Sequence, residues 1–300
     1  MTDHHSRRRY EVKHRTRYTY TDDVTTSFER AMLRPRETAL QTVLEHDIVI
    51  SPEPDLLEES LDAFGNWTHY VEITTPHTEL VVAKRSVVEI AWPLPDLAAL
   101  NRWTVRSAAE ALASDPAVDA FEHAAYTLPS RLATREQAVL DFAASVLPPE
   151  RPLGEAIEAM YRDIYSGFTY AQGVTSVATT LPEVLASRAG VCQDFAHLGV
   201  AAFRAAGLPA RYVSGYIETA PAPGTVKLEG SDASHAWVGV QVPGGDWVDL
   251  DPTNNHLADS RYIVTAWGRD YRDVSPLKGI IFTEGSGSSL TVAVDVKRLS

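Results

Sequence analysis

Alternation of apolar and polar residues near the start of the chain is the feature that most constrains its fold. Between residues 10 and 90, several segments repeat with a period of two, which is the period of a β-strand that buries one face. The first of these segments runs through Val12, His14, Thr16, Tyr18 and Tyr20. Turn-forming residues at 51–54 and 64–66 separate the segments. The region is therefore predicted to be an antiparallel sandwich or small barrel.

Two prolines, Pro93 and Pro95, end this pattern, and the composition after them shifts to Ala, Leu and Glu. The sequence predicts a β-rich N-terminal domain over 1–95, and a helical connector followed by a second, mixed core over 96–300. Helices are predicted at 98–113, 116–124, 135–146 and 153–166, with Asp115 and Thr134 as N-caps. A last strand at 290–296 follows a flexible-looking stretch at 284–289 and is expected to pack back on one of the sheets.

The residues that carry chemistry lie between 181 and 255. A short helix at 181–187 precedes a second helix that opens at Val191 and Cys192 and is closed by Gly207. Strands are predicted at 209–217, 234–242 and 247–251. The loop at 218–232, rich in Pro, Gly and acidic residues, leads to the second of these strands and is expected to border a cleft as a lid.

Cys192 falls in the first turn of a predicted helix, where unpaired backbone N–H groups and the positive end of the helix dipole favour a thiolate. His235 begins a predicted strand and Asp251 ends the next one. A histidine that shares the thiol proton and a carboxylate that orients the histidine complete a catalytic triad. A helix-start Cys, a strand His and a strand-end Asp, in that order, form the topology of papain-like cysteine chemistry.

These residue types also have more ordinary interpretations. A lone cysteine is usually a small buried hydrophobe, but the neighbours Gly190, Gln193 and Asp194 are small or polar. His197 lies roughly 140° around the helix from Cys192, which favours a structural role for this histidine and disfavours a metal site built from Cys192, His197 and His235. Asp249 competes with Asp251 as the third member of the triad.

The hairpin between His235 and Asp251 sets a register condition. A symmetric turn at 243–246 would place Asp251 opposite Val238 and send Asp251 and His235 to opposite faces of the sheet. One extra residue on either strand restores a common face and selects Asp251 over Asp249. We therefore predict a β-bulge or an asymmetric turn, at or beside Gly244 and Gly245, where glycine tolerates the required backbone angles.

The acidic balance of the chain excludes some classes of partner. The chain holds 27 Lys and Arg against 40 Asp and Glu, a formal charge of −13, whereas phosphate binding needs a cationic face, so no nucleic-acid partner is expected. The single cysteine, Cys192, excludes an intramolecular disulfide and suits a cytoplasmic location. No run approaches the roughly 20 apolar residues that cross a bilayer, so no membrane partner is expected.

Four linked motifs resemble the core of the bacterial transglutaminase-like cysteine enzymes. They are GVCQDFAH at 190–197, GLPARYVSGY at 207–216, ASHAW at 233–237 and WVDLDPTN at 247–254. The N-terminal half is similar to the β-rich region that precedes this core in one bacterial subgroup, through RPR at 34–36, DAFGN at 62–66 and PH at 76–77. The resemblance implies an α+β fold, with an N-terminal antiparallel β domain followed by a papain-like, transglutaminase-like core.

The resemblance also implies roles for the triad: Cys192 as nucleophile, His235 as general base and acid, and Asp251 as the orienting carboxylate. It implies thiol-dependent cleavage or transfer at a peptide or protein amide, as a cysteine protease or amidase. The alternatives are a transglutaminase acyltransferase and a non-catalytic peptide-binding module. No cofactor or metal is expected, and the β-rich region either binds a partner protein or, as we favour, only covers the core.

The second donor of an oxyanion hole is left open. The backbone N–H of Cys192 is one candidate donor. Tyr170 or Gln172 would supply the other, although each is more readily interpreted as a structural or loop residue.

Overall fold

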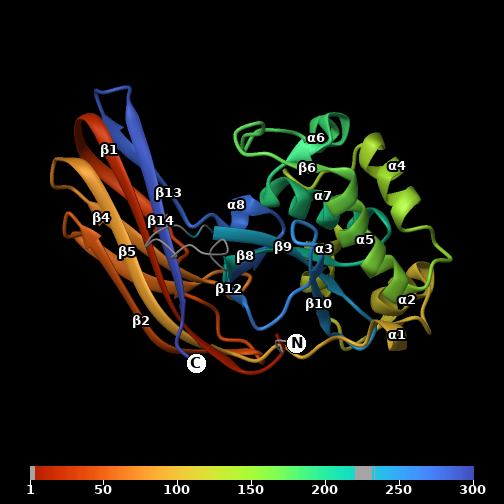
Figure 1. Ribbon diagram of the computed structural model, residues 1–300. Helices are drawn as coiled ribbons and strands as arrows, with labels where there is room; N and C mark the ends of the chain where they lie inside the picture. Colours follow the sequence, from red (N-terminus) through yellow and green to blue (C-terminus); the bar gives the residue numbers. More distant parts are fainter. Residues whose placement is uncertain (1–3, 220–231, 233) are drawn as a thin grey trace, which may run out of the picture.

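The computed structural model describes residues 4–219, 232 and 234–300. It has three layers: a strongly curved sheet on one side, a second sheet in the middle and a group of helices on the other side (Figure 1). The predicted α+β class and the N-terminal antiparallel sheet are confirmed. Most of the predicted lid at 218–232 lies outside the described residues.

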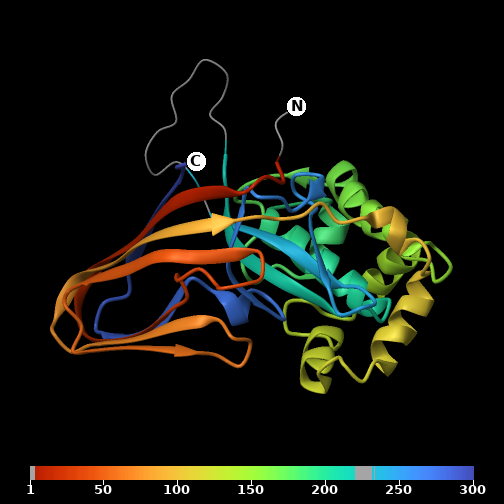
Figure 2. The same ribbon diagram turned by 90° about the horizontal axis from the view of Figure 1, so that it is seen from below.

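The first sheet is organised around one very long strand, β1 (Arg8–Ala31). Its hydrogen-bonded order is β2-β5-β1-β4-β3. The other strands of this order are β2 (Gln41–Ser51), β3 (Leu56–Leu61), β4 (Trp67–Ile73) and β5 (His77–Ile90). The first half of β1 pairs with β5 up to Thr19 and, after a shift in register, again at Val24, and the second half pairs with β4 from Ser27 onward. Because β1 changes partners along its length, the sheet curls over on itself (Figure 2).

The C-terminal strand returns to the first sheet, as expected from the sequence. Strand β14 (Ser288–Arg298) runs antiparallel to β1, from Tyr10 opposite Arg298 to Tyr20 opposite Ser288. A further strand, β13 (Leu277–Thr283), pairs with the second half of β1 and was not predicted. Its three consecutive apolar residues, from Ile280 to Phe282, interrupt the two-residue alternation that identifies a half-buried strand.

The helical connector differs in detail from the prediction. The single helix predicted at 98–113 is two helices, α1 (Leu97–Leu100) and α2 (Val105–Ser114). The second begins because Thr104 and Ser107 form a reciprocal capping box. The remaining connector helices are α3 (Ala120–Thr127), α4 (Gln137–Val146) and α5 (Leu153–Gly167).

Both predicted N-caps in this region were wrong. Asp115 stands at the end of α2 and not at the start of a helix. The N-cap of α3 is Asp119, whose carboxylate accepts the backbone N–H of Glu122. Glu136, and not Thr134, is the N-cap of α4. Several polar residues precede each helix, so the local preference for a polar N-cap does not by itself select one of them.

The middle layer is an antiparallel sheet with the order β11-β10-β9-β8-β12. Its strands are β8 (Ala210–Ile217), β9 (Ser234–Gln241), β10 (Trp247–Asp251), β11 (His256–Leu257) and β12 (Tyr262–Gly268). One face packs on the helices, mainly through α7 (Cys192–Ala205), which buries Phe195, Leu198 and Phe203. Full burial of such side chains stabilises the fold by about 1.5–3 kcal/mol each.

The other face of the middle sheet packs on the first sheet. Tyr10 and Val12 of β1, Val294 and Val296 of β14, and Trp237 of β9 belong to this buried cluster. The remaining elements are β6 (Thr169–Tyr170), α6 (Leu181–Ser187), β7 (Ala189–Gly190) and α8 (Tyr271–Val274). Within the described part of the chain, no helix is both long and apolar enough to cross a membrane.

Candidate active site

Cys192 is the first residue of α7, as predicted, and its side chain is half-buried. The carboxylate of Asp194, two residues later, accepts the backbone N–H of Val191 at 2.8 Å and the hydroxyl of Thr175 at 2.7 Å. A Cβ at Gly190 would lie 2.8 Å from this carboxylate, so a side chain there would displace it. The residues around the cysteine therefore fix the start of the helix.

The hairpin that carries His235 and Asp251 has the asymmetric turn that the sequence requires. Trp247 pairs with Gln241 and Leu250 with Val238, so the register differs by one residue from that of a symmetric turn. Val242 and Asp246 close a loop through a 2.9 Å hydrogen bond. Inside it, Gly244 and Gly245 adopt φ values of 108° and 86°, in the left-handed region that glycine tolerates. The prediction of an asymmetric turn at these glycines is confirmed.

This register brings His235 and Asp251 together on one face. Nε2 of His235 lies 2.6 Å from Oδ2 of Asp251, and both side chains are buried. Burial alone would lower the pKa of His235, but the negative charge and hydrogen bond of Asp251, together with a hydrogen bond to Cys192, raise it to about 10. The structure therefore joins Cys192, His235 and Asp251 in a chain of contacts in the predicted order.

Besides His235, four other groups donate hydrogen bonds to the carboxylate of Asp251. The hydroxyl of Tyr262 donates to Oδ2 at 2.6 Å and the side-chain amide of Asn254 donates to the same oxygen at 2.7 Å. The backbone N–H groups of Thr253 and Asn254 donate to Oδ1. Although burial opposes ionisation, His235 and these donors hold the pKa of Asp251 well below its usual range. The carboxylate is therefore charged and fixed in orientation.

Sequence reasoning missed the roles of Tyr262 and Asn254. Asn254 carried a signal, because it follows Asp251 in a Pro-containing turn whose backbone folds back on the carboxylate. Tyr262 carried none, since it comes from β12 and reaches Asp251 only through the tertiary fold.

Asp249, the competing carboxylate, belongs to a different network. Its Oδ2 accepts the indole N–H of Trp237 at 2.8 Å, and its Oδ1 lies 3.5 Å from a guanidinium nitrogen of Arg211. That guanidinium is stacked between the rings of Trp247 and Trp267. Burial raises the pKa of Asp249, so this carboxyl differs electrostatically from Asp251 as well. Trp237 in turn stacks on the ring of His235, so Asp249 contacts the histidine only through Trp237.

His197 has the structural role that was expected. Its Nε2 accepts the backbone N–H of Tyr271 at 3.1 Å, and its ring packs on Tyr212. Burial lowers its pKa to about 4, so it is neutral near pH 7.

Of the two candidates for a second oxyanion donor, Tyr170 lies near the cysteine, and Gln172 hydrogen-bonds to Tyr170. Tyr170 ends β6, which pairs in parallel with the residues just before Cys192. Burial is the main cause that raises the pKa of the Tyr170 hydroxyl, and the nearby Cys192 adds to it. A hydrogen bond with Gln172 opposes this shift. Both side chains are exposed, so they border the solvent-accessible side of the thiol.

Two family models match this chain. Residues 10–89 match the bacterial transglutaminase-like N-terminal region, and residues 141–252 match the transglutaminase-like superfamily. The chain belongs to the bacterial transglutaminase-like family. The second match contains Cys192, His235 and Asp251, and the first covers most of the curved sheet. The resemblance inferred from the motifs is confirmed.

Relatives of similar length support this membership. An uncharacterized protein of Mycobacterium tuberculosis is 42% identical over 303 residues, which cover 96% of this chain and 92% of the relative. One of Mycobacterium leprae is 35% identical, with 97% and 99% covered. A solved structure from Cytophaga hutchinsonii, named as a candidate cysteine protease, matches with a TM-score of 0.77 at 20% identity over 98% of this chain and 92% of that one. This last match shows that the two proteins share a fold.

Proposed function

We propose that this transglutaminase-like protein is a cysteine hydrolase that cleaves a peptide or protein amide through an acyl-enzyme. The observation that carries the proposal is the 2.6 Å contact of His235 with Asp251, together with the hydrogen bond of His235 to Cys192. Membership of a superfamily of cysteine enzymes supports the same chemistry. The three residues have the roles of nucleophile, general acid and base, and orienting carboxylate.

In the first half of the reaction, the Cys192 thiolate attacks the amide carbonyl carbon and forms a tetrahedral oxyanion. Cys192 is the first residue of α7, so its backbone N–H has no partner within the helix and can donate to this oxygen. We propose Tyr170 or Gln172 as the second donor, because Tyr170 lies near the thiol and Gln172 hydrogen-bonds to Tyr170. His235 gives its proton to the departing amine, and a thioester remains on Cys192.

In the second half, His235 takes a proton from water, which attacks the thioester carbonyl. The carboxylic acid then leaves and the thiolate and imidazolium are restored. Asp251 stays ionised throughout and stabilises the imidazolium. A primary amine in place of water would give transfer and not hydrolysis, so the two reactions share the acyl-enzyme and differ in the acceptor.

The substrate class and location are part of the proposal. A peptide or protein acyl donor agrees with the name of the Cytophaga structure, and the low cysteine content agrees with a cytoplasmic location.

Capture of the acyl donor from a cell lysate tests this function. Wild-type protein should retain a thioester-linked peptide or protein fragment that is absent from Cys192→Ala. Identified substrates are then incubated with and without a primary amine. Release of free acid in the presence of the amine supports the hydrolase, whereas amide formation with the amine supports the transglutaminase. Non-covalent capture that is equal in both forms would indicate a peptide-binding module.

A further inference from the structure

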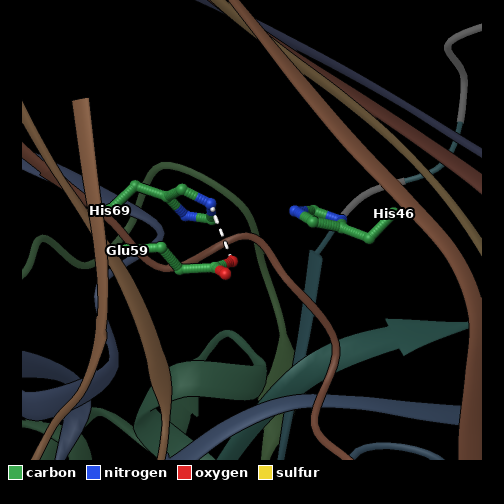
Figure 3. A group of neighbouring side chains, drawn as sticks. All are labelled: His46, Glu59 and His69. Carbon is green, nitrogen blue, oxygen red and sulfur yellow. Dashed lines mark ion pairs between the residues drawn. The ribbon is translucent and has the colours of Figure 1, made fainter.

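Three side chains of the types that bind metal ions, two histidines and one glutamate, meet where the two edges of the first sheet approach each other. They are His46 of β2, Glu59 of β3 and His69 of β4, and one nitrogen or oxygen of each lies within 4.8 Å of the others (Figure 3). Strands β2 and β3 end the hydrogen-bonded order of this sheet. The cluster therefore spans the opening of the curled sheet.

Hydrogen bonding leaves one of the two imidazoles, that of His46, ready to act as a ligand. Nδ1 of His46 contacts the hydroxyl of Ser86 at 2.9 Å, which orients the ring, while its Nε2 is buried and has no partner among the described residues. Figure 3 shows the His46 ring pointing toward His69 and Glu59.

The geometry of one ligand pair already suits a small metal ion. Nε2 of His69 lies 3.2 Å from Oε1 of Glu59. Metal bonds of about 2.0–2.2 Å in a tetrahedral site place neighbouring ligand atoms about 3.4 Å apart. Only His46 has to move closer. The contact of Ser86 with the far nitrogen of that ring is typical of the outer shell of metal sites.

The charged neighbours restrict which ion is suitable. Arg34 donates to both oxygens of Glu59, at 2.8 and 2.7 Å. Lys84 of β5 is buried, and its ammonium lies 3.5 Å from the hydroxyl of Ser86 that contacts His46. Ca²⁺ and Mg²⁺ prefer several oxygen ligands, whereas this cluster offers one carboxylate that is shared with a cation. Two imidazoles and one carboxylate suit zinc and similar transition metals.

We propose that His46, His69 and Glu59 form a structural site for a divalent transition metal of the zinc class, which links the edge strands β2 and β3. A ligand that binds only the folded state raises stability in proportion to the logarithm of its concentration over the dissociation constant. The expected consequence is therefore a more stable first sheet. The proposal is independent of the chemistry proposed for Cys192.

Zinc binding to the metal-free full-length chain tests the site by titration calorimetry and thermal unfolding. The background is Cys192→Ser, so that the thiol and His235 do not compete for zinc. We expect one zinc per chain and a higher melting temperature. His46→Ala should weaken binding by more than about 100-fold, since changes in the outer shell alone cost about 10- to 100-fold. Glu59→Gln, which keeps the size of the side chain, should also weaken it.

Two further variants keep the test interpretable if a ligand variant unfolds. His77→Ala removes another buried histidine of the same sheet and should leave zinc affinity unchanged. Arg34→Gln keeps all three ligands and removes the guanidinium on Glu59, so it should bind zinc more tightly. Absence of zinc binding in the parent, or equal zinc affinity in His46→Ala and His77→Ala, would overturn the proposal.

Discussion

Nε2 of His235 lies 2.6 Å from Oδ2 of Asp251, across the hairpin of β9 and β10. This contact exists because a loop with two left-handed glycines shifts the pairing of the strands by one residue relative to a symmetric turn. With one imidazole nitrogen bound to Asp251, the ring is oriented so that it can also hydrogen-bond to Cys192. The turn thus determines whether the candidate catalytic groups can act together.

Substitutions in the three groups should have unequal effects on amide cleavage. Cys192→Ala should abolish activity because the nucleophile is lost, and His235→Ala should reduce kcat/KM by about 10²–10⁴-fold. Asp251→Asn should keep more activity than either, since an orienting group contributes less than the groups that it orients. Steady-state kinetics on a substrate identified by acyl-enzyme capture provide the measurement. Near-normal turnover by His235→Ala would contradict the triad.

Tyr262→Phe should act through Asp251. The change removes the 2.6 Å hydrogen bond to Oδ2 but keeps the ring that packs on Trp237. A hydrogen bond to a charged group is worth about 1.5–3 kcal/mol, so we expect a fall in kcat of roughly 10- to 100-fold with little change in KM. Loss of this donor should also change the titration of His235, which NMR of the imidazole would detect. A variant with unchanged kcat and unchanged titration would show that Tyr262 does not position Asp251.

His235 and His197 should differ in protonation at the same pH. Asp251 and Cys192 raise the pKa of His235 to about 10 despite its burial, whereas burial lowers that of His197 to about 4. At pH 7.5, imidazole ¹⁵N shifts should therefore show an imidazolium at His235 and a neutral ring at His197. Two neutral rings at this pH would contradict the charged pair with Asp251.

The raised pKa of His235 also predicts how the stability of the protein depends on pH. The folded state holds the His235 proton more tightly than the unfolded state, whose pKa is about 6.5. The stabilisation that comes from protonated His235 is fully present below pH 6.5 and is lost as the pH rises to about 10. Lys84 acts in the opposite direction, because its folded-state pKa is lowered to about 7. The test is therefore the difference in unfolding free energy between the wild type and Asp251→Asn, which should shrink over this range.

Cys192 should be alkylated selectively near neutral pH. It is half-buried, starts a helix and contacts an imidazole that Asp251 keeps charged, which are surroundings typical of reactive cysteines. Iodoacetamide labelling followed by mass spectrometry should proceed well below pH 8.5, where an ordinary thiol begins to react. His235→Ala should move the labelling to higher pH, and His197→Ala provides a control at a buried histidine. Labelling that rises only above pH 8 in the wild type would contradict this prediction.

The sequence predicted the parts of the site that depend on local pattern. Cys192 at a helix start and the asymmetric turn at Gly244 and Gly245 follow from spacing and from the alternation of side chains along strands. Tyr262 and the tryptophans around Arg211 could not be predicted, because their contacts join segments far apart in the chain. The N-caps Asp119 and Glu136 were missed for a different reason, since neighbouring polar residues offer nearly equal local preferences.

The turn itself can be tested with single alanine substitutions. Gly245 has a φ of 86°, and no atom lies within 4 Å of the position that a Cβ would occupy, so Gly245→Ala adds backbone strain without a steric clash. We expect it to lower the free energy of unfolding by about 1–2 kcal/mol. Because the turn determines which face Asp251 occupies, we also expect a lower pKa for His235.

Gly173→Ala is the matched control for this strain. Gly173 has a φ of 77° and open space around it, but it lies outside the hairpin. This variant should lose stability without a change in the pKa of His235. Chemical denaturation and NMR titration of both variants make the comparison. If Gly245→Ala lost no stability, or if both variants changed the His235 titration equally, the left-handed turn would not be what sets the register of His235 and Asp251.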